Sequence, residues 1–553
     1  MDTIFLKDKF NELLNAFKHA KTFEEQNNSF KELNKHRLLY EGTKNLRMLN
    51  HYSDMNNVKA QEEYAAIQQS EPLYLSLVND YYETILSATY RDDLEKVWGE
   101  QLFKLAEIKI KTFNNEVAEE IEKENKLILE YQQIFRKAES VFRGEIILLS
   151  SLTPYIFSSD RSTRKEAFES KYLFFQKNEK EFDRILNELV KVRHQMALKL
   201  GYPSYIELGY HRMHRTNLNQ GDFKKYRKQV KEVGVPLVND LRHKQKERLQ
   251  VEKLTYYDEH VYFQTPAPKP MGDYQQILNT YRHVFDELSP ETSSFYHEIM
   301  RNGKLDVQDR PEKTGGAFAT YIGQEVAPYL YCNFNGTSND VRVFAHEAGH
   351  AFQFYMTREK QIHEYIIPFD SAELFSFIME RLVWPWMEQF FGDEVNRYKY
   401  EHLTQGIMYM PIASVVDEFE HFLYQYPTAT SQERKQQWRK LEKEYMPEKD
   451  YDQNEFLERG MGFCEYGHIF STPFYFIDYD LAHFCSLQMW MKQQKEGVPP
   501  VQSFISMCES GGSLSFEDLL ARANLMSPFE EGSLATILEE VQVWLNNVDH
   551  HNF

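Results

Sequence analysis

Residues 343–355 read VFAHEAGHAFQFY, in which two histidines flank a glutamate inside an otherwise apolar stretch. On a helix, His346 and His350 project from the same face one turn apart, so their imidazoles can share one metal ion. Glu347 lies about 100° around the helix and can face a water molecule on that ion. The pattern predicts a buried helix that holds a divalent metal, and zinc suits imidazole nitrogen.

The apolar neighbours of this motif argue against a chance occurrence. A chain with 19 histidines produces the H-E-x-x-H string by accident now and then. Here Phe344, Ala345, Ala348 and Phe352 indicate that the helix is buried. Buried imidazoles and carboxylates without partners are costly, and a metal ion supplies the missing partner.

A third ligand must come from outside the motif. The metzincin pattern requires Gly at 353 and His at 356, but the chain has Gln353 and Met356 there. A downstream carboxylate is the alternative, and the candidates are Glu364, Asp370, Glu373 and Glu380. Glu364 lies in the polar stretch REKQIHEY, which we expect to be exposed.

Glu373 is the best third ligand among these candidates. It lies in SAELFSFIME, whose apolar residues indicate a buried helix. Glu380 follows two turns later on the same face, where it can accept a hydrogen bond from a histidine ligand. We therefore predict Glu373 as the ligand and Glu380 as its supporting carboxylate.

Composition narrows the class of protein. The net charge of −20 argues against nucleic acid as the main partner. Four scattered cysteines without C-x-x-C spacing indicate buried thiols in a reducing compartment. No apolar run approaches the roughly 18 residues of a membrane span, and the N-terminus lacks a signal-peptide pattern. We expect a cytoplasmic protein without a membrane partner.

The chain reads as mostly α-helical in two parts. Only 23 Gly and 19 Pro interrupt its 553 residues, which favours long helices. Amphipathic spacing predicts helices within 8–35, 58–90, 93–142 and 162–200. A break near 150–170, with Ser159 or Asp160 as the next helix cap, divides a helical domain (1–155) from a catalytic domain (156–553).

Two basic clusters could mark an anion site. These are HRMHR at 211–215 and RHKQKER at 242–248. Both clusters lie in helical patterns with acidic residues nearby, so we interpret each cluster as a solvated helix face.

A hairpin is predicted immediately before the metal motif. Residues 315–338 contain two short runs of aromatic and β-branched residues with a Gly-containing turn between them. We expect 329–334 to be an edge strand that pairs with an extended peptide and presents it to the metal. The predicted substrate-binding residues are Gly316, Tyr329, Tyr331 and Asn333.

Several motifs together resemble a known family. The stretches GGAFATYI, APYLYCNFNGTSNDVRVFAHEAGHAFQ, SAELFSFIMERL and EYGHIFSTPFYFIDYDLA are similar to the oligoendopeptidase F and thimet oligopeptidase family of zinc metallopeptidases. The resemblance covers about 160–545 and is closest to bacterial oligoendopeptidase F and Pz-peptidase. It implies a helical ellipsoid around a deep substrate channel, with a small β-sheet beside the H-E-x-x-H helix.

The same resemblance implies a function and its residues. Short unstructured peptides would be cut internally by an enzyme with one zinc per chain, held by His346, His350 and Glu373, with Glu347 as general base. His468, Tyr475 and Tyr479 occupy the region that contacts the substrate and the developing oxyanion in this family. The spacing after His468 departs from the thimet pattern, which leaves the assignment of each tyrosine open.

Two other functions remain possible at this point. An exopeptidase of the dipeptidyl carboxypeptidase type could use the same ligands, and a peptide-binding protein could carry a non-catalytic zinc. Glu347 argues against the latter, because a structural site needs no base beside its ligands. The sequence leaves open whether the chain is a monomer or a homodimer.

Overall fold

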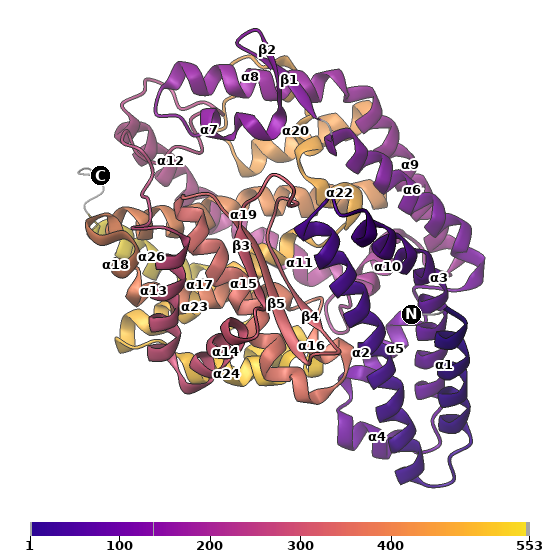
Figure 1. Ribbon diagram of the computed structural model, residues 1–553. Helices are drawn as coiled ribbons and strands as arrows, with labels where there is room; N and C mark the ends of the chain where they lie inside the picture. Colours follow the sequence, from indigo (N-terminus) through magenta and orange to yellow (C-terminus); the bar gives the residue numbers. More distant parts are fainter. Residues whose placement is uncertain (1–2, 137, 549–553) are drawn as a thin grey trace.

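The computed structural model describes residues 3–136 and 138–548, and the chain is mostly α-helical, as predicted (Figure 1). The first half contains α1 Thr3–Lys18, α2 Phe23–Ser53, α3 Val58–Leu86, α4 Arg91–Trp98, α5 Gln101–Lys109, α6 Ala118–Arg136, β1 Glu139–Phe142, β2 Glu145–Leu148, α7 Thr153–Ile156, α8 Arg161–Lys177, α9 Glu179–Lys199, α10 Tyr205–Arg212, α11 Gln220–Gln229, α12 Val235–Leu249, α13 Tyr274–Leu288 and α14 Pro290–Arg301.

The second half carries the predicted metal motif. It contains β3 Leu305–Gln308, β4 Phe318–Ile322, β5 Ala327–Phe334, α15 Ser338–Thr357, α16 His363–Ile366, α17 Ala372–Leu382, α18 Glu388–Phe391, α19 Val395–Gln425, α20 Ser431–Tyr445, α21 Glu455–Glu458, α22 Gly467–Ser471, α23 Phe476–Glu496, α24 Val501–Ser510, α25 Phe516–Arg522 and α26 Ser533–Asn547. Helices α1 and α26 lie on opposite sides of the molecule (Figure 1).

The N-terminal helices α1–α5 have a hydrophobic core of their own, which also includes Ile362 and Tyr365 from the region of α16. A buried ion pair joins the same two parts, because Arg37 of α2 contacts Glu364. Tyr82 of α3 also donates to Glu364, whose exposed fraction is only 4%. The prediction that Glu364 is exposed is therefore wrong. Its sequence neighbours are polar, but a guanidinium from a distant helix covers it.

Two predicted helices are shorter than the periodicity suggested. The segment 8–35 is interrupted between α1 and α2, where the Thr22 side chain accepts from the Glu25 amide and caps α2. The segment 93–142 breaks into α4, α5 and α6 and ends in strand β1. Strands β1 and β2 form an antiparallel hairpin that we did not predict. Amphipathic spacing did not reveal these breaks, which depend on local capping.

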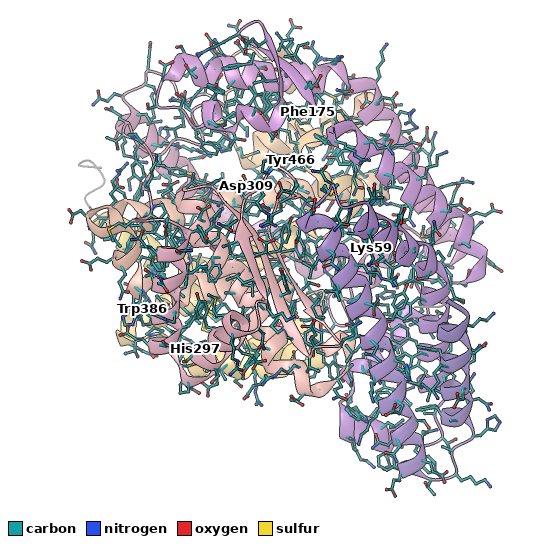
Figure 2. All side chains as sticks on the ribbon, in the orientation of Figure 1. Lys59, Phe175, His297, Asp309, Trp386 and Tyr466 are labelled. Atoms are coloured by element: carbon teal, nitrogen blue, oxygen red, sulfur yellow. The ribbon has the colours of Figure 1, made fainter. Side chains whose placement is uncertain are left out.

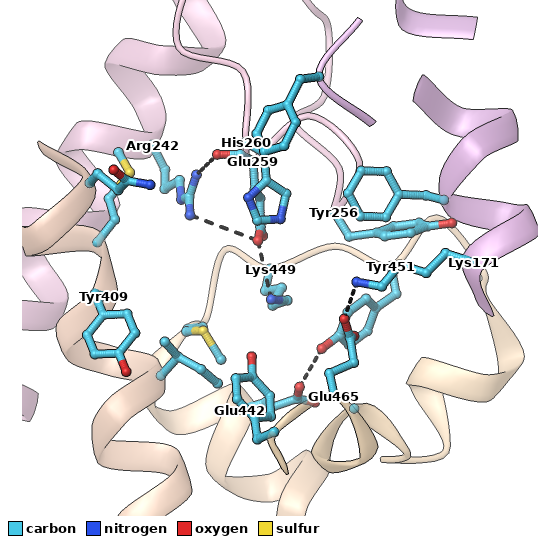
Figure 3. A pocket seen from close by; sticks show the side chains of 18 of the residues that line it. Lys171, Arg242, Tyr256, Glu259, His260, Tyr409, Glu442, Lys449, Tyr451 and Glu465 are labelled. Atoms are coloured by element: carbon cyan, nitrogen blue, oxygen red, sulfur yellow. Dashed lines mark hydrogen bonds and ion pairs between the residues drawn. The ribbon is translucent and has the colours of Figure 1, made fainter. Parts of the chain in front are cut away.

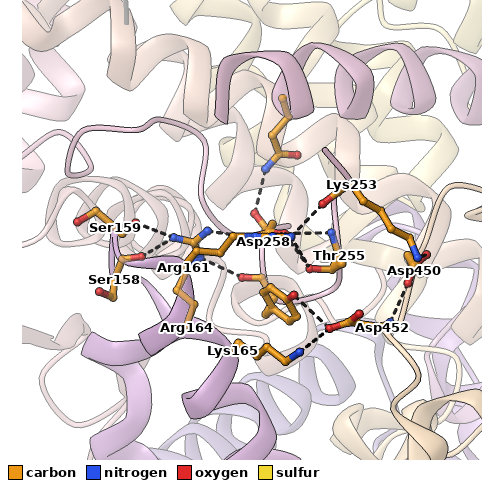
Figure 4. Close-up of polar contacts among 12 residues, drawn as sticks. Ser158, Ser159, Arg161, Arg164, Lys165, Lys253, Thr255, Asp258, Asp450 and Asp452 are labelled. Carbon is orange, nitrogen blue, oxygen red and sulfur yellow. Dashed lines mark hydrogen bonds and ion pairs between the residues drawn. The ribbon is translucent and has the colours of Figure 1, made fainter. Parts of the chain in front are cut away.

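The region after residue 158 is fixed by a buried carboxylate. Asp160 caps α8 by accepting from the Thr163 amide at 2.8 Å, as one of the two predicted caps. Arg161 and Arg164 of the same helix then converge on Asp258, which is fully buried (Figure 4). These contacts hold the loop that follows α12 against α8.

The predicted hairpin is confirmed, but its predicted edge strand is wrong. Strands β4 and β5 pair antiparallel, and β3 adds to the other side of β5 in parallel, so the order is β3-β5-β4. Strand β5 is therefore the central strand. The sequence did not reveal β3, which is only four residues long and comes from a separate segment.

Helix α15 lies between this sheet and α17, and a glycine sets how closely the two helices approach. A Cβ atom on Gly349 would lie 2.4 Å from the Phe375 carbonyl oxygen and 2.7 Å from the Ser376 Cα. Any larger residue would push α17 away. This close crossing brings the first turn of α17 to the histidines of α15.

Helix α19 has a buried side and a side that lines a cavity. Four residues at helical spacing border a cavity of about 380 Å³, namely Glu401, Gln405, Tyr409 and Ile412. Gln405 is exposed although the helix runs through the middle of the molecule.

Further expectations concern thiols and membranes. All four cysteines are buried with free thiols, as predicted. Among the described residues, none of the helices combines the length and the apolar character that crossing a bilayer requires.

Candidate metal centre

Three predicted ligands converge where α15 crosses α17. The Nε2 atoms of His346 and His350 lie 3.3 and 3.5 Å from Glu373 Oε2. One ligand atom from each residue lies within 4.8 Å of the other two. Two imidazoles and one carboxylate are a donor set that zinc uses in catalytic sites. The three residues therefore fit a single zinc ion.

A chain of hydrogen bonds orients His346. Its Nδ1–H donates to Glu380 Oε1 at 2.7 Å, and His402 Nε2–H donates to Glu380 Oε2 at 2.7 Å. Trp384 Nε1–H donates to His402 Nδ1 at 3.0 Å, which leaves the His402 proton on Nε2. This arrangement directs the Nε2 lone pair of His346 toward the metal position. The prediction placed Glu380 beside a histidine ligand, as observed, but His402 was not predicted.

Glu347 lies beside the ligands in a buried position. Its Oε2 atom has no hydrogen-bond partner among the described residues. Burial raises the pKa of Glu347, while the neighbouring histidines oppose the shift. The backbone N–H of Ala319 in β4 lies close enough to this carboxylate to lower its pKa. An unpaired buried carboxylate oxygen is expected where a proton is to be accepted.

The contact from Ala319 also shows which strand edge faces the site. Strand β4 is hydrogen-bonded to β5 on one side only, so its other edge is free within the sheet. Because the Ala319 N–H reaches Glu347, this free edge runs beside the metal centre. The strand with an edge unpaired by another strand beside Glu347 is therefore β4 rather than β5, although the Tyr321 carbonyl of β4 accepts from the Asn45 side chain of α2 at 2.9 Å.

The predicted substrate-binding tyrosines of β5 lie on the face of the sheet that points away from the metal centre. Tyr331 is fully buried, and its hydroxyl donates to the carbonyls of Tyr52 and Thr314. Tyr329 packs in the same cluster against α2. Asn333 donates to the carbonyls of Thr314 and Gly316 and so holds the loop before β4. The structure does not bring the two tyrosines to the metal centre, because alternation along β5 turns them to the opposite face of the sheet.

Gly316, the fourth predicted substrate-binding residue, lies in the loop before β4. It is exposed, with φ of +103°, and lies two residues before β4. A Cβ atom there would meet nothing within 4 Å. The glycine therefore serves the backbone conformation of the loop at the entrance to the free strand edge.

His468, Tyr475 and Tyr479 come together near the ligands. The His468 ring stacks on Tyr475 with centroids 5.7 Å apart, and Tyr479 meets both rings edge-on. The Tyr475 hydroxyl donates to Glu373 Oε1 at 2.6 Å, so this tyrosine contacts a predicted ligand directly. Burial lowers the pKa of His468 and raises the pKa of Tyr475, which keeps both side chains neutral at pH 7.

Two buried arginines hold the backbone of this segment, a role that was not predicted for either of them. Arg215 donates to the Phe474 carbonyl at 2.6 Å, and Glu420 accepts from the Phe474 amide at 2.8 Å. Phe474 has φ of +71°, an unfavourable conformation for a side-chain-bearing residue. Arg193 donates to the Ile469 and Phe470 carbonyls. We call Arg193, Arg215 and Glu420 the loop clamp.

The basic cluster at 211–215 belongs to this arrangement. Arg215 pairs with Asp478 at 2.5 Å, and Arg212 pairs with Glu124, which also binds Arg193. The prediction of a solvated helix face is therefore wrong for this cluster. In the second cluster, Arg248 is also buried and donates to the Tyr262 carbonyl. Pairing over long sequence distances neutralises charges that look exposed in the sequence.

Two cavities lie along α19, and the smaller one is lined by Glu380 and Phe377, which both contact His346. A cavity of about 320 Å³ is lined by Phe377 and Tyr479, and a second of about 380 Å³ is lined by α8, α19 and the loop after α12. Gln405 and Tyr409 border both. Figure 3 shows the larger cavity, where Glu259 contacts Arg242 and Lys449. Tyr466, another lining residue, lies near the centre of the molecule (Figure 2).

Sequence comparison identifies two matching family profiles. "Peptidase family M3" matches residues 155–538, and "Peptidase M3 N-terminal domain" matches residues 1–113. A protein described as an oligoendopeptidase F homolog from Borreliella burgdorferi is 24% identical over 422 residues, which cover 71% of this chain and 68% of that protein.

Solved structures are similar over the whole chain. Pz peptidase A with an inhibitor is 40% identical, with 100% of this chain and 98% of that chain covered and a TM-score of 0.93. A protein assigned to oligoendopeptidase F from Bacillus anthracis is 38% identical, with the same coverage and a TM-score of 0.89.

Proposed function

Because the chain belongs to peptidase family M3, we propose that it is a zinc-dependent endopeptidase that hydrolyses internal bonds of short, unstructured peptides. The observation that carries the proposal is the convergence of His346, His350 and Glu373 beside Glu347, which has an unpaired buried oxygen. A free strand edge next to this group supports peptide binding.

His346, His350 and Glu373 would hold one zinc ion per chain. When bound, zinc supplies Lewis-acid chemistry, polarising a carbonyl and making water acidic enough to attack near neutral pH. Glu380 and His402 fix the orientation of His346, and Tyr475 and Ser376 hold Glu373. These contacts preorganise the donors before any metal or substrate arrives.

Substrate would bind to β4 as an additional strand. The backbone of an extended peptide can pair with the free edge of β4, which supplies affinity with little dependence on sequence. Ala319 lies at this edge beside Glu347, so pairing there would bring a peptide bond to the site. The cavities along α19 are partly covered by α8, α17 and α23, and we expect this cover to favour short, unfolded chains.

Glu347 would act as general base and then as general acid. Its free Oε2 takes a proton from the attacking water and returns it to the leaving amine. His468 and the two tyrosines would donate hydrogen bonds to the oxyanion that forms on the substrate carbonyl. A neutral imidazole and a neutral phenol each keep a proton to donate, which agrees with the directions of the pKa shifts at His468 and Tyr475.

We place the enzyme in the cytoplasm, where the reducing environment suits four buried free thiols. Its partners would be peptides, with neither nucleic acid nor membrane involved. A monomer would suffice for the proposed reaction, because every group in it comes from one chain, and a homodimer remains compatible with it.

The test compares the products of wild type and Glu347→Gln on a mixture of 5- to 30-residue peptides by mass spectrometry. We expect internal cuts in the shorter peptides, and a turnover about 10²- to 10⁴-fold lower in the variant with zinc retained. Glu359→Gln is a matched control, because Glu359 is exposed and lies outside the site.

Two results would change the proposal. Release of terminal dipeptides alone would identify an exopeptidase of the dipeptidyl carboxypeptidase type. Zinc-loaded protein that cuts none of the peptides would favour a peptide-binding protein with a non-catalytic metal.

A further inference from the structure

The smaller cavity, which we call the α19 side pocket, opens beside the metal centre. It lies among α15, α17, α19 and α23 and measures about 320 Å³. Phe377 lines it and also packs edge-on against the His346 ring, with centroids 5.1 Å apart. Tyr479 lines it from the other side. The Phe377 side chain therefore borders both the proposed metal centre and this pocket.

Arg381 is a buried lining residue without an anionic partner. Its exposed fraction is 1%, and its Nη1 atom has no hydrogen-bond partner among the described residues. Its Nη2 atom reaches only the His402 carbonyl at 3.5 Å. The adjacent Glu380 favours the charge of Arg381 from a distance, but its two oxygens already accept from His346 and His402, and it forms no ion pair with Arg381 among the described residues.

Other fully buried arginines of the chain are satisfied differently. Arg37, Arg193 and Arg215 each contact a carboxylate. Arg434 has no acid but donates to an amide oxygen and a backbone carbonyl. Burying an unpaired cation costs several kcal/mol, so a charge left in this state at the wall of a cavity indicates a missing anion.

Two further groups point to the same ligand chemistry. Arg342 lines the pocket from α15, and its side chain donates only to Asn339 within its own helix. His483 is 2% exposed, and neither ring nitrogen has a partner among the described residues. Gly406 makes room for this ring, since a Cβ atom there would lie 2.1 Å from it. Among its described lining residues the pocket thus offers several donors, and its one carboxylate, Glu380, already accepts two hydrogen bonds, while Glu401 outside the lining lies close enough to Arg342 for their charges to interact.

We propose that the α19 side pocket is a subsite that binds a carboxylate of the peptide substrate through Arg381 and Arg342. A guanidinium presents two parallel N–H groups that match a carboxylate, and the burial of Arg381 strengthens the contact. The ligand is either the C-terminal carboxylate of a peptide or an acidic side chain near the scissile bond. This inference rests on the proposed peptidase function and specifies its substrate class.

The experiment uses one neutral parent peptide that the enzyme cleaves and measures kcat/KM for derivatives. One series replaces each position in turn by Glu or by its isostere Gln, and a second compares the free C-terminal acid with the C-terminal amide. We expect the acid form at one fixed distance from the cut to be cleaved about 10- to 100-fold faster than its amide. The first series identifies a side chain as the source, and the second identifies the chain terminus.

Variants assign the effect to the pocket. Arg381→Met and Arg342→Gln should each reduce the preference for acid over amide toward unity. Arg434→Met is the matched control, because Arg434 is equally buried and equally without an acid but does not line the pocket. It should keep the preference. Arg342 is partly exposed, so its variant still tests the proposal if Arg381→Met fails to fold.

Equal cleavage of every acid and amide pair by wild type would overturn the subsite, as would a folded Arg381→Met variant with the preference intact. Absence of any cleavage would instead contradict the proposed function. In that case fluorescence anisotropy of labelled acid and amide peptides on the wild-type protein still decides the subsite, because tighter binding of the acid supports it and equal binding refutes it.

Discussion

The crossing of α15 and α17 and the segment 466–479 both supply side chains to one site, but they are held in different ways. At the crossing, the proposed ligands come from two helices within 28 residues of sequence, and helical spacing fixes the relative positions of the two histidines. The 466–479 segment is held by the loop clamp, whose arginines come from α9 and the turn after α10, more than 250 residues away. Helical spacing within a short stretch of sequence positions the side chains of the first region. Buried arginines from distant parts of the sequence position the backbone of the second.

The difference leads to an expectation about function. A site held by helical spacing should lose its metal only when a ligand or its immediate support is changed. A segment held by distant buried charges should be sensitive to residues that touch neither metal nor substrate.

Glu373→Ala should remove zinc almost completely, because the variant leaves two imidazoles and no carboxylate donor. Metal analysis of the purified protein measures the effect, and Glu359→Ala, in an exposed position, serves as the control. If Glu373→Ala keeps full zinc while Asp370→Ala or Glu380→Ala loses it, the third ligand is assigned wrongly.

Arg215→Ala should lower the free energy of unfolding by about 3–5 kcal/mol, since it leaves Asp478 buried without its partner. Denaturant unfolding measures this change. Arg143→Ala removes an exposed pair with Glu166 and should cost less than about 1 kcal/mol. In the folded fraction, turnover should fall while zinc content stays full. Loss of zinc together with turnover would show that the two regions are not held independently.

Stability should fall in acid through Glu124, which pairs with Arg193 and Arg212. Burial alone would raise the pKa of Glu124, but the two guanidinium charges outweigh it and lower the pKa to about 2. A carboxylate with a lowered pKa stabilises the fold fully above its ordinary value of about 4.5, and this contribution is lost as the pH falls toward 2. The loss amounts to about 3 kcal/mol.

Unfolding titrations between pH 2.5 and 6 check this expectation against Glu124→Gln, which cannot ionise. The gap in stability between the two proteins should be widest above pH 4.5 and should close in acid. A gap that stays constant with pH would exclude Glu124 as the source.

Glu380→Ala should weaken zinc binding by about 10- to 100-fold without abolishing it, because His346 loses the acceptor that orients it. Competition with a chelator of known affinity measures the change. His402→Phe should have a smaller effect in the same direction, since it acts on His346 only through Glu380. Equal affinity in wild type and Glu380→Ala would show that the helix alone orients the imidazole.

The same division explains what the sequence could predict. The spacing of His346, Glu347 and His350 and the two-turn separation of Glu373 and Glu380 are local patterns, and the predicted ligands do converge in the structure. The mostly helical class and the β4–β5 hairpin also follow from patterns within short stretches of sequence. By contrast, the burial of Glu364 depends on Arg37, the central place of β5 depends on β3, and the basic cluster at 211–215 is paired with Glu124 and Asp478. Periodicity carries no information on partners this distant.

Tyr475 is where the two regions meet, and it tests whether they act separately. Its hydroxyl donates to Glu373 Oε1, while Glu373 Oε2 faces the two histidines. Tyr479 instead packs on Phe377 and on the Tyr475 ring. Tyr475→Phe would leave a buried carboxylate oxygen without its donor, and we expect zinc affinity to fall by about tenfold. Tyr479→Phe should leave zinc affinity within a factor of two.

Chelator competition on both variants separates two roles for Tyr475. A donor to the oxyanion alone would lower kcat in Tyr475→Phe without changing zinc affinity, whereas a support of the ligand changes zinc affinity even without substrate. If the two phenylalanine variants bind zinc equally and both lose turnover, the segment acts only on the substrate. If only Tyr475→Phe loses zinc affinity, the loop clamp also reaches the metal, since Arg215 and Glu420 hold the neighbouring Phe474.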